Sequence, residues 1–376
     1  MLRTITELMK TPGRPFSPHI TCVNSSKISP EKQLMDTMFI VGGWTPTATS
    51  CAVERFYPLY NEWRTMAPML KRCGDVAVCS LGGMIFTLGG RDDITSVSSV
   101  EKYDPNTNLW SREVASLSSP RSGVCVVEMD GLMYALGGFD GTVCTNIVER
   151  YDPVLDAWTK MAPMLQHRSG ASAAVLDGYL YVMGGTDGDI PLNSVERFNP
   201  LEGTWRPCPP MRSAREQPGC TVYLRRIYVA GGRDELHLEL STTEKFDPDN
   251  LKWTHVKHMR QKRFKVSLAV FDGTLLAVGG SDGISTLTSV EAYNPDSNTW
   301  RISGGPGDGD VSFEGERREG CTDDLVALPN RCRGDSVSNI SLLPYISPDA
   351  QRLPFCSRES RLWAQRMQRE SERVNF

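Results

Sequence analysis

Residues 121–160, RSGVCVVEMDGLMYALGGFDGTVCTNIVERYDPVLDAWTK, contain the pattern on which most of the chain is built. Two apolar runs, 124–129 and 132–136, flank the dipeptide Asp130-Gly131, and two further short runs flank Asp152-Pro153. Glycine accepts a positive φ and proline fixes φ near the value that a turn needs. Short apolar or alternating runs between such turns are typical of strands, so the stretch predicts four antiparallel β-strands.

The same pattern occurs six times, with a period of 47 or 48 residues. A glycine pair follows the second apolar run of each unit, at 42–43, 89–90, 137–138, 184–185, 231–232 and 279–280. A glutamate opens the third run, at Glu54, Glu101, Glu149, Glu196, Glu244 and Glu291. An aromatic residue, a proline and a tryptophan follow at fixed distances, and the tryptophans are Trp63, Trp110, Trp158, Trp205, Trp253 and Trp300. Such a register indicates an internal repeat.

This register resembles the kelch repeat, and the likeness covers residues 38–302. The resemblance implies an all-β fold, a six-bladed kelch β-propeller with four antiparallel strands in each blade. A four-stranded sheet that is apolar on both faces cannot bury them alone, whereas blades packed around one axis can. The repeats extend over about 38–66, 72–112, 121–160, 168–207, 215–255 and 263–302.

The repeated residues have structural roles under this interpretation. The glycine pairs lie near the crowded axis, where a side chain would obstruct the approach of backbones. The tryptophans and the aromatic residues of the third strands are suited to filling the space between blades. An acid present in every unit is more often a structural partner than a catalyst. A periodic arginine could pair with it, at Arg72, Arg121, Arg168, Arg215 and Arg263.

The two ends of the chain do not follow the repeat. We expect residues 1–37 to be a flexible leader and residues 303–376 to be a divergent, mostly disordered tail. The first repeat begins with its second strand, so the first blade is incomplete. In kelch-like proteins the segment after the last tryptophan supplies the missing strand. Two segments are candidates for it, 318–328 and 19–24, and neither matches the register.

Composition restricts the kind of partner and the compartment. The net charge of −4 does not indicate a nucleic-acid or membrane surface, and no apolar run is long enough to span a bilayer. The eleven cysteines form no CxxC motif, and several lie within apolar runs. This usage is typical of reduced thiols. It favours the cytosol or nucleus, and we expect a cytoplasmic protein.

The sequence does not indicate an enzyme. His255 and His258 have no nearby carboxylate or cysteine in the chain, and the motifs of hydrolases, metalloproteases and nucleotide-binding loops do not occur. The glycine pairs precede loops rather than helices, so they do not cradle phosphates. We therefore expect no catalytic residue, no cofactor and no metal.

A binding function is the alternative, because loops that break a repeat are free to specify partners. In kelch-like proteins the loops after the glycine pairs and the turns with the periodic arginines meet on one face, which receives peptide segments. Transferred by position, the candidate contacts are Trp44, Arg72, Arg91, Arg121, Phe139, Arg168, Arg215, Arg233 and Arg263. The turn arginines recur in the repeats, so a structural role is the alternative for them. Aspartates in the same loops partly offset the positive charge.

The repeats look most like the propeller of adaptors that carry BTB and BACK domains and present substrates to cullin-type E3 ubiquitin ligases. Residues 1–37 are too short for either domain. The resemblance therefore implies a protein-interaction module that holds a protein or peptide substrate, with cullin contacted only through a BTB domain absent here. The alternative is an actin-binding or cytoskeletal scaffold, since other kelch proteins bind actin filaments.

Overall fold

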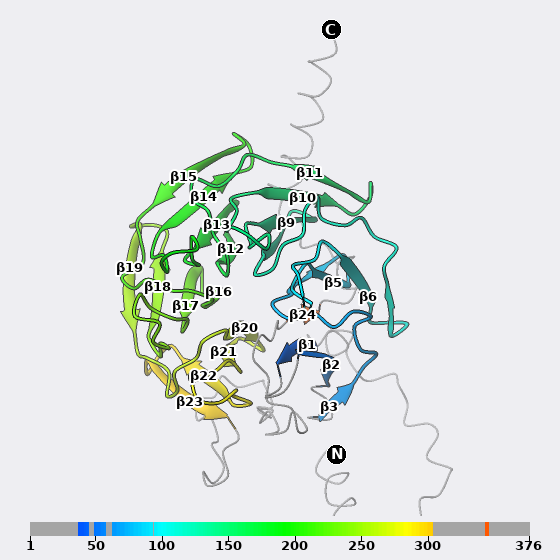
Figure 1. Cartoon of the computed structure of the whole chain (residues 1–376). Helices are drawn as coiled ribbons and strands as arrows, with labels where there is room; N and C mark the ends of the chain where they lie inside the picture. Colours follow the sequence, from blue (N-terminus) through cyan, green and yellow to red (C-terminus); the bar gives the residue numbers. More distant parts are fainter. Residues whose placement is uncertain (1–36, 45–48, 58–61, 93, 304–342, 346–376) are drawn as a thin grey trace, which may run out of the picture. The chain divides into compact units, whose positions relative to one another are not determined.

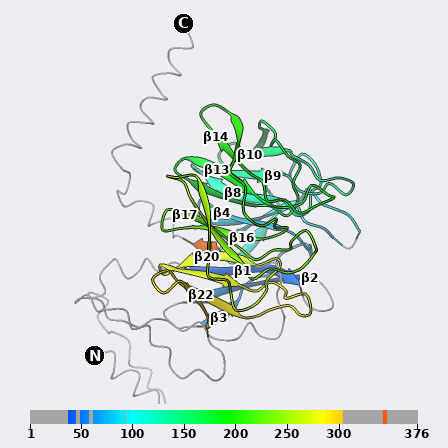
Figure 2. The same ribbon diagram turned by 90° about the vertical axis from the view of Figure 1, so that its left-hand side faces the viewer.

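The computed structural model describes residues 37–44, 49–57, 62–92, 94–303 and 343–345, which form six four-stranded antiparallel sheets around a central axis (Figure 1). The order along the chain runs from one sheet to the next, and no helix occurs in these residues. Figure 2 shows the ring of blades from the side. The predicted six-bladed propeller is confirmed.

In every blade the strands run in order from the axis outward. Blade 1 contains β24 (Leu343–Tyr345), β1 (Thr37–Trp44), β2 (Thr49–Tyr57) and β3 (Glu62–Thr65). Blade 2 contains β4 (Ala77–Leu81), β5 (Met84–Leu88), β6 (Val100–Asp104) and β7 (Leu109–Ser111). Blade 3 contains β8 (Cys125–Met129), β9 (Leu132–Leu136), β10 (Val148–Asp152) and β11 (Ala157–Lys160).

The other three blades repeat this arrangement. Blade 4 contains β12 (Ser172–Leu176), β13 (Tyr179–Met183), β14 (Val195–Asn199) and β15 (Thr204–Cys208). Blade 5 contains β16 (Gly219–Tyr223), β17 (Arg226–Ala230), β18 (Thr243–Asp247) and β19 (Lys252–Val256). Blade 6 contains β20 (Ser267–Phe271), β21 (Thr274–Val278), β22 (Val290–Asn294) and β23 (Thr299–Ser303).

The ring is closed by β24, which pairs antiparallel with β1 through Leu343, Pro344 and Tyr345. It lies between the inner strands β20 and β4. The two candidate segments for this strand, 318–328 and 19–24, lie outside the described residues. The strand that pairs with β1 comes from neither of them. Most of the predicted leader and tail also lies outside them. Blade 1 is complete, and the propeller takes a strand from beyond residue 302.

Close backbone contact explains the glycine pairs. Gly137 has a φ of 59°, and a Cβ built on it would lie 2.2 Å from the carbonyl oxygen of Arg168 in the next turn. Any side chain would therefore force the two backbones apart. This confirms that the pair ends the second strand where the chain is most crowded.

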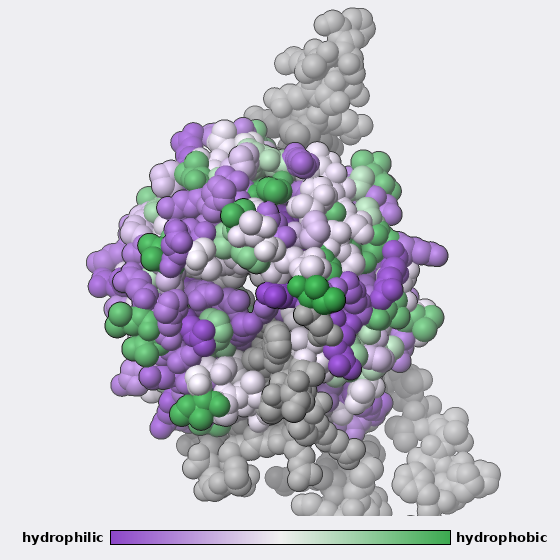
Figure 3. Space-filling model, viewed as in Figure 1, coloured by the Kyte–Doolittle hydropathy of each residue, from purple (hydrophilic) through white to green (hydrophobic). Residues whose placement is uncertain are grey.

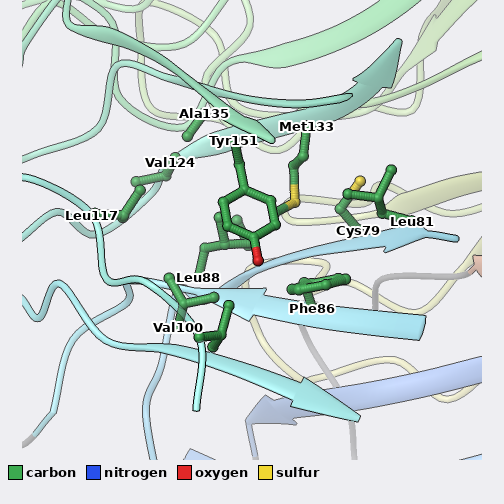
Figure 4. Close-up of a cluster of buried hydrophobic side chains, with 12 residues drawn as sticks. Cys79, Leu81, Phe86, Leu88, Val100, Leu117, Val124, Met133, Ala135 and Tyr151 are labelled. Atoms are coloured by element: carbon green, nitrogen blue, oxygen red, sulfur yellow. The ribbon is translucent and has the colours of Figure 1, made fainter. Parts of the chain in front are cut away.

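The core lies between the blades. In one cluster, Tyr151 and Met133 of blade 3 pack against Phe86 and Leu88 of blade 2 (Figure 4). The rings of Phe86 and Tyr151 are 5.8 Å apart, and Tyr151 contacts Trp158 at 5.1 Å. A buried side chain of this size contributes about 1.5–3 kcal/mol. The predicted filling of the space between blades by aromatic residues is confirmed.

Polar contacts join neighbouring blades at their outer edge. The indole Nε1 of Trp158 donates to the carbonyl of Ala115, in the connection from blade 2, at 2.9 Å. Asp156 accepts from the Ala115 N–H at 2.9 Å and from the Tyr151 hydroxyl at 2.8 Å. Blades 2 and 6 repeat the second arrangement with Asn108 and Tyr103 and with Asn298 and Tyr293. In blades 4 and 5 the tyrosine is replaced by phenylalanine, and the Asp or Asn by Gly203 or Leu251, so these side-chain hydrogen bonds are not possible there.

Ring closure by β24 gives a first prediction. Ending the chain after Ser303 removes β24 and exposes the inner edge of β1, which needs backbone hydrogen-bond partners. We expect the melting temperature to fall and amide exchange in β1 to rise well above that in β12 or β16. Hydrogen exchange with mass-spectrometric detection measures both regions in one experiment.

The matched control ends the chain after residue 350 and keeps β24. Its β1 amides should stay as protected as in the full chain. Equal protection of β1 in the two truncated chains would contradict a closing role for β24.

Candidate functional site

One face of the propeller, here called the loop face, carries the loops after the glycine pairs and the turns before the inner strands. Backbone bridges join the two sets: Gly74 pairs with Arg91, Ser122 with Phe139, and Glu216 with Arg233. The Phe139 N–H donates to the Ser122 carbonyl at 2.8 Å, and the Arg233 N–H donates to the Glu216 carbonyl at 2.9 Å. The predicted loops and turns therefore do meet around the axis.

Buried arginine–glutamate clips hold these connections in blades 3 to 6. In blade 4, Arg168 donates to Glu196 from Nε at 3.0 Å and from Nη2 at 2.9 Å. Its Nη1 donates to the carbonyls of Gly184 and Ser194 at 2.8 and 3.1 Å. Glu196 also accepts the backbone N–H of Leu165 at 2.6 Å. Burial lowers the pKa of Arg168, and the charge of Glu196 opposes that shift.

The clips correct part of the site prediction. The four clip arginines are fully or almost fully buried and pair with the glutamate of the same blade, so they cannot contact a partner on the surface. The pairs are Arg121–Glu149, Arg168–Glu196, Arg215–Glu244 and Arg263–Glu291. Their recurrence marks the frame of the fold, which was the structural alternative for these residues.

Blade 2 differs, because Cys73 occupies the clip position. Gly74 pairs with Arg91 as Ser122 pairs with Phe139, and a Cβ on Gly90 would lie 3.2 Å from the Cβ of Cys73. In blade 3 the corresponding distance, from Gly138 to Arg121, is 3.1 Å. Burial raises the pKa of the Cys73 thiol. Arg72 therefore stands one residue before the clip position, and it is exposed.

Blade 2 has the glutamate of the other clips, Glu101, but lacks the buried arginine that pairs with it. Glu101 is buried and accepts the N–H of Leu70 at 2.9 Å. Its other oxygen accepts from Nε of Arg112 at 3.1 Å, and Arg112 is about half exposed. A surface arginine on the fourth strand thus partly takes the place of the missing clip.

The remaining predicted contacts lie at the starts of the loops. Arg91 is exposed and Phe139 is half-buried. Arg233 forms a 3.0 Å ion pair with Glu239 of its own loop, and its guanidinium lies 4.0 Å from the ring centre of Phe264. Trp44 is the last residue of β1 and pairs with Thr49, and its side chain lies outside the described part of the structure.

The loop aspartates cap turns. Asp92 accepts the N–H groups of Ile94 and Thr95 at 3.1 and 2.8 Å, which together with Lys71 lowers its pKa to about 2. Asp140 accepts those of Thr142 and Val143 at 2.7 and 2.9 Å. The equivalent caps in the next three blades are Asp187, Asp234 and Asp282. These carboxylates fix the loop backbone and are not simply counter-charges to the arginines.

Five residues at the mouth of the central channel were not among those predicted from the sequence. They stand two positions after the clip position and are Asp75, Gly123, Gly170, Gln217 and Lys265. Successive backbone hydrogen bonds of 2.8–3.2 Å link each of them to the next, and all five have a positive φ. One feature of the sequence could have identified them. The residue type at this position differs among the repeats, although the position lies two residues after the clip position.

The mouth is asymmetric. Lys265 forms an ion pair with Asp75, so that side chains from blades 6 and 2 meet across blade 1. Over blades 3 and 4 the mouth residues are Gly123 and Gly170, which add no side chain. The mouth leads into a channel of about 390 Å³ lined by the inner strands β4, β8, β12, β16 and β20. In the space-filling view, hydrophilic residues border part of a central opening (Figure 3).

The channel offers little chemistry. Burial raises the pKa of Cys79 and Cys220 to about 12 and that of Cys125 well above its usual range, so these thiols are protonated and weakly nucleophilic. The described residues contain no group of three or more His, Cys, Asp or Glu side chains placed to hold a metal ion. No described helix could cross a membrane. The absence of enzyme activity stays a prediction.

Six four-stranded blades, the clip glutamates and the tryptophans between blades define the chain as a kelch β-propeller. It matches the model of the KLHDC2/KLHL20/DRC7 Kelch-repeats domain over residues 32–218 and 76–280, and the Kelch motif over 262–305. The chain therefore belongs to this kelch-repeat family, whose propellers act as protein-interaction modules.

Curated relatives include human Kelch-like protein 4, 36% identical over 85 residues, which are 21% of this chain and 12% of that protein. Kelch-like ECH-associated protein 1A of Danio rerio is 35% identical over 91 residues, 23% of this chain and 15% of that protein. The matches thus span a small part of these relatives. The solved structure titled "Structure of YjhT" has the same fold, with a TM-score of 0.61, 13% identity and coverage of 70% of this chain and 96% of that one.

The clips give a second prediction. Arg168→Gln leaves Glu196 buried without its guanidinium, and we expect a loss of about 3–5 kcal/mol in the free energy of unfolding. Cys73→Arg supplies blade 2 with a clip for Glu101. We expect a gain of about 1 kcal/mol, because hydrogen bonds to charged groups outweigh the burial of the guanidinium by a small margin. Urea denaturation measures both.

Arg206→Gln, a change at an exposed arginine of blade 4, is the matched control and should change the free energy of unfolding by less than about 0.5 kcal/mol. Destabilisation by Cys73→Arg would show that Cys73 does not occupy a clip position.

The aspartate caps give a third prediction. The pKa of Asp92 is lowered in the folded state, so its cap is fully formed above about pH 4 and is lost as the pH falls toward 2. We expect the amide resonances of Ile94 and Thr95 to shift over that window. In Asp92→Asn the side-chain oxygen still accepts but does not titrate, so the shift should disappear. A shift centred near pH 4 in the unmodified chain would contradict the cap.

Proposed function

We propose that this chain is the substrate-recognition propeller of a kelch-like adaptor for cullin-type E3 ubiquitin ligases, and that its loop face binds a segment of the substrate. The observation that carries the proposal is the contrast on that face between a fixed frame and variable side chains. Clips and aspartate caps hold the loop backbone. Arg91 and Phe139 extend from this frame beside the channel mouth.

The chemistry of the face suits an extended peptide. The guanidinium of exposed Arg91 can take a carboxylate in a bidentate way, and the half-buried ring of Phe139 offers an apolar surface. Gly123 and Gly170 let a backbone approach the mouth over blades 3 and 4. Arginine and aromatic residues are the side chains that most often dominate binding energy at interfaces.

The ligase part of the proposal is supported by the similarity to kelch-like proteins. In the adaptors of that type the BTB domain contacts cullin, so recruitment of a ligase requires a BTB domain outside the residues present here.

We also propose a cytoplasmic location. The seven cysteines in the described part of the chain are free thiols, which suits a reducing compartment.

The fourth prediction tests the loop face. Proximity labelling with the full chain identifies candidate partners, and titration calorimetry with each purified candidate measures the dissociation constant. Arg91→Ala combined with Phe139→Ala should weaken binding at least tenfold, or about 1.4 kcal/mol, because both side chains lie beside the mouth. The melting temperature should change little.

Val154→Ser is the control, since Val154 is exposed on the opposite face of the same blade as Phe139. It should leave the dissociation constant unchanged. Equal binding by all three proteins would refute the loop-face site.

An actin-binding scaffold is the alternative function. Co-sedimentation of the full chain with filamentous actin, in the absence of any ligase component, would favour it. Recovery of a cullin scaffold together with a substrate, through a BTB-containing chain, would favour the adaptor.

A further inference from the structure

Blade 5 contains an unusual turn on the face opposite the loop face. The turn between β16 and β17 is formed by Leu224 and Arg225, with φ values of 48° and 54°. The four other inner hairpins in the described part of the chain have glycine at the second of these positions and glycine or aspartate at the first. A positive φ brings Cβ close to the backbone, so leucine and arginine are poor choices there.

The second turn of the same blade repeats the anomaly. Leu251, between β18 and β19, has a φ of 53°, whereas its counterparts in the described blades are Asn108, Asp156, Gly203 and Asn298. The two turns are separated by two strand spacings of about 4.8 Å each, so they lie roughly 10 Å apart at the same edge of one sheet. Three unfavourable residues are therefore gathered in one place.

Packing within the described residues does not offset the strain. Leu224 is 60% exposed and Leu251 is 46% exposed. Arg225 is 78% exposed and forms a 3.4 Å ion pair with Asp177, an exposed interaction that stabilises little. Strained backbone clusters at functional positions such as ligand-binding sites. Asp-Gly, the pair used in blades 3, 4 and 6, would relieve the strain in the first turn.

The charges around the two turns decide the kind of partner. Arg226 is held by Asp247 in a 3.0 Å ion pair between the turns, so Arg225 is the more available guanidinium. Asp177, Asp247 and Asp249 balance Arg225, Arg226 and Lys252. A nucleic acid or an anionic membrane needs an excess of positive charge, which this region does not have. Two exposed leucines beside one available guanidinium suit an apolar protein surface with a carboxylate.

We propose that Leu224, Arg225 and Leu251 form a second protein-binding site, here called the blade-5 turn site. Its partner presents an extended segment whose apolar side chains pack against the two leucines and whose carboxylate pairs with Arg225. The site lies on the face opposite the proposed substrate site, so the propeller holds two proteins at once. It does not depend on the loop-face function.

The test replaces the three residues by those of the other blades: Leu224→Asp, Arg225→Gly and Leu251→Asn. Because the strain is relieved, the melting temperature of the triple variant should rise by about 3 °C or more, so any loss of binding cannot come from unfolding. The probe is a display library of random 12-residue peptides selected on the full chain. Selected peptides should combine apolar residues with Asp or Glu and bind the triple variant at least tenfold more weakly.

The loop-face variant, Arg91→Ala with Phe139→Ala, should bind these peptides as well as the unmodified chain does. The proposal is overturned if the triple variant melts no higher, if no selected peptide distinguishes it from the unmodified chain, or if the discriminating peptides lack an acid. Stronger binding of the unmodified chain than of the triple variant to phosphatidylserine vesicles would also overturn it, in favour of a membrane.

Discussion

The loop face of this propeller depends on the burial of a guanidinium group. An arginine removed from water is tolerated only when carboxylate and carbonyl oxygens take up its N–H groups. In blade 4 the oxygens come from Glu196, Gly184 and Ser194, which belong to three different parts of the blade. One side chain therefore fixes a glycine pair, a third strand and the connection from the previous blade relative to one another. In blades 3 to 6 the loop backbone is anchored through such a side chain.

Blade 2, which lacks the buried arginine, shows how much of the loop position depends on it. With Cys73 at the clip position, the backbone bridge between Gly74 and Arg91 still forms. Packing between blades is thus sufficient to set the loop approximately. The charge of Glu101 is then met from the solvent side by Arg112, and the connection has one anchor fewer than its counterparts. Blades with the same fold can differ in how firmly they hold the loop that meets a partner.

The fold was predictable from the sequence because its determinants are periodic. Trp158, Tyr151 and the glycine pair at 137–138 have counterparts with the same packing role in the other blades. Their regular spacing therefore identifies the architecture. The site was predictable only in part. Arg121 and its counterparts looked like contacts because they precede the inner strands, but their periodicity reflected a shared structural role. Arg72 was grouped with the periodic arginines because it lies one residue before Cys73, which occupies the clip position of blade 2.

The closing strand β24 could not be predicted for a different reason. It has only three residues, it pairs through backbone groups that any residue supplies, and it contains Pro344, which is found in sheets at edge strands. The connections between other blades span far fewer residues than the one before β24. Neither its spacing nor its side-chain pattern distinguishes residues 343–345 in the sequence. The need for such a strand follows only from the inner edge of β1, which would otherwise be unpaired.

The position of β24 in the chain has a consequence for synthesis. Blades 2 to 6 are completed by Ser303, but the inner edge of β1 has no partner until Tyr345 leaves the ribosome, about 40 residues later. At ~5–20 residues per second, translation of that interval takes roughly 2–8 s. During this time the nascent chain is an open arc of blades with an exposed strand edge, to which chaperones or a second nascent chain can bind.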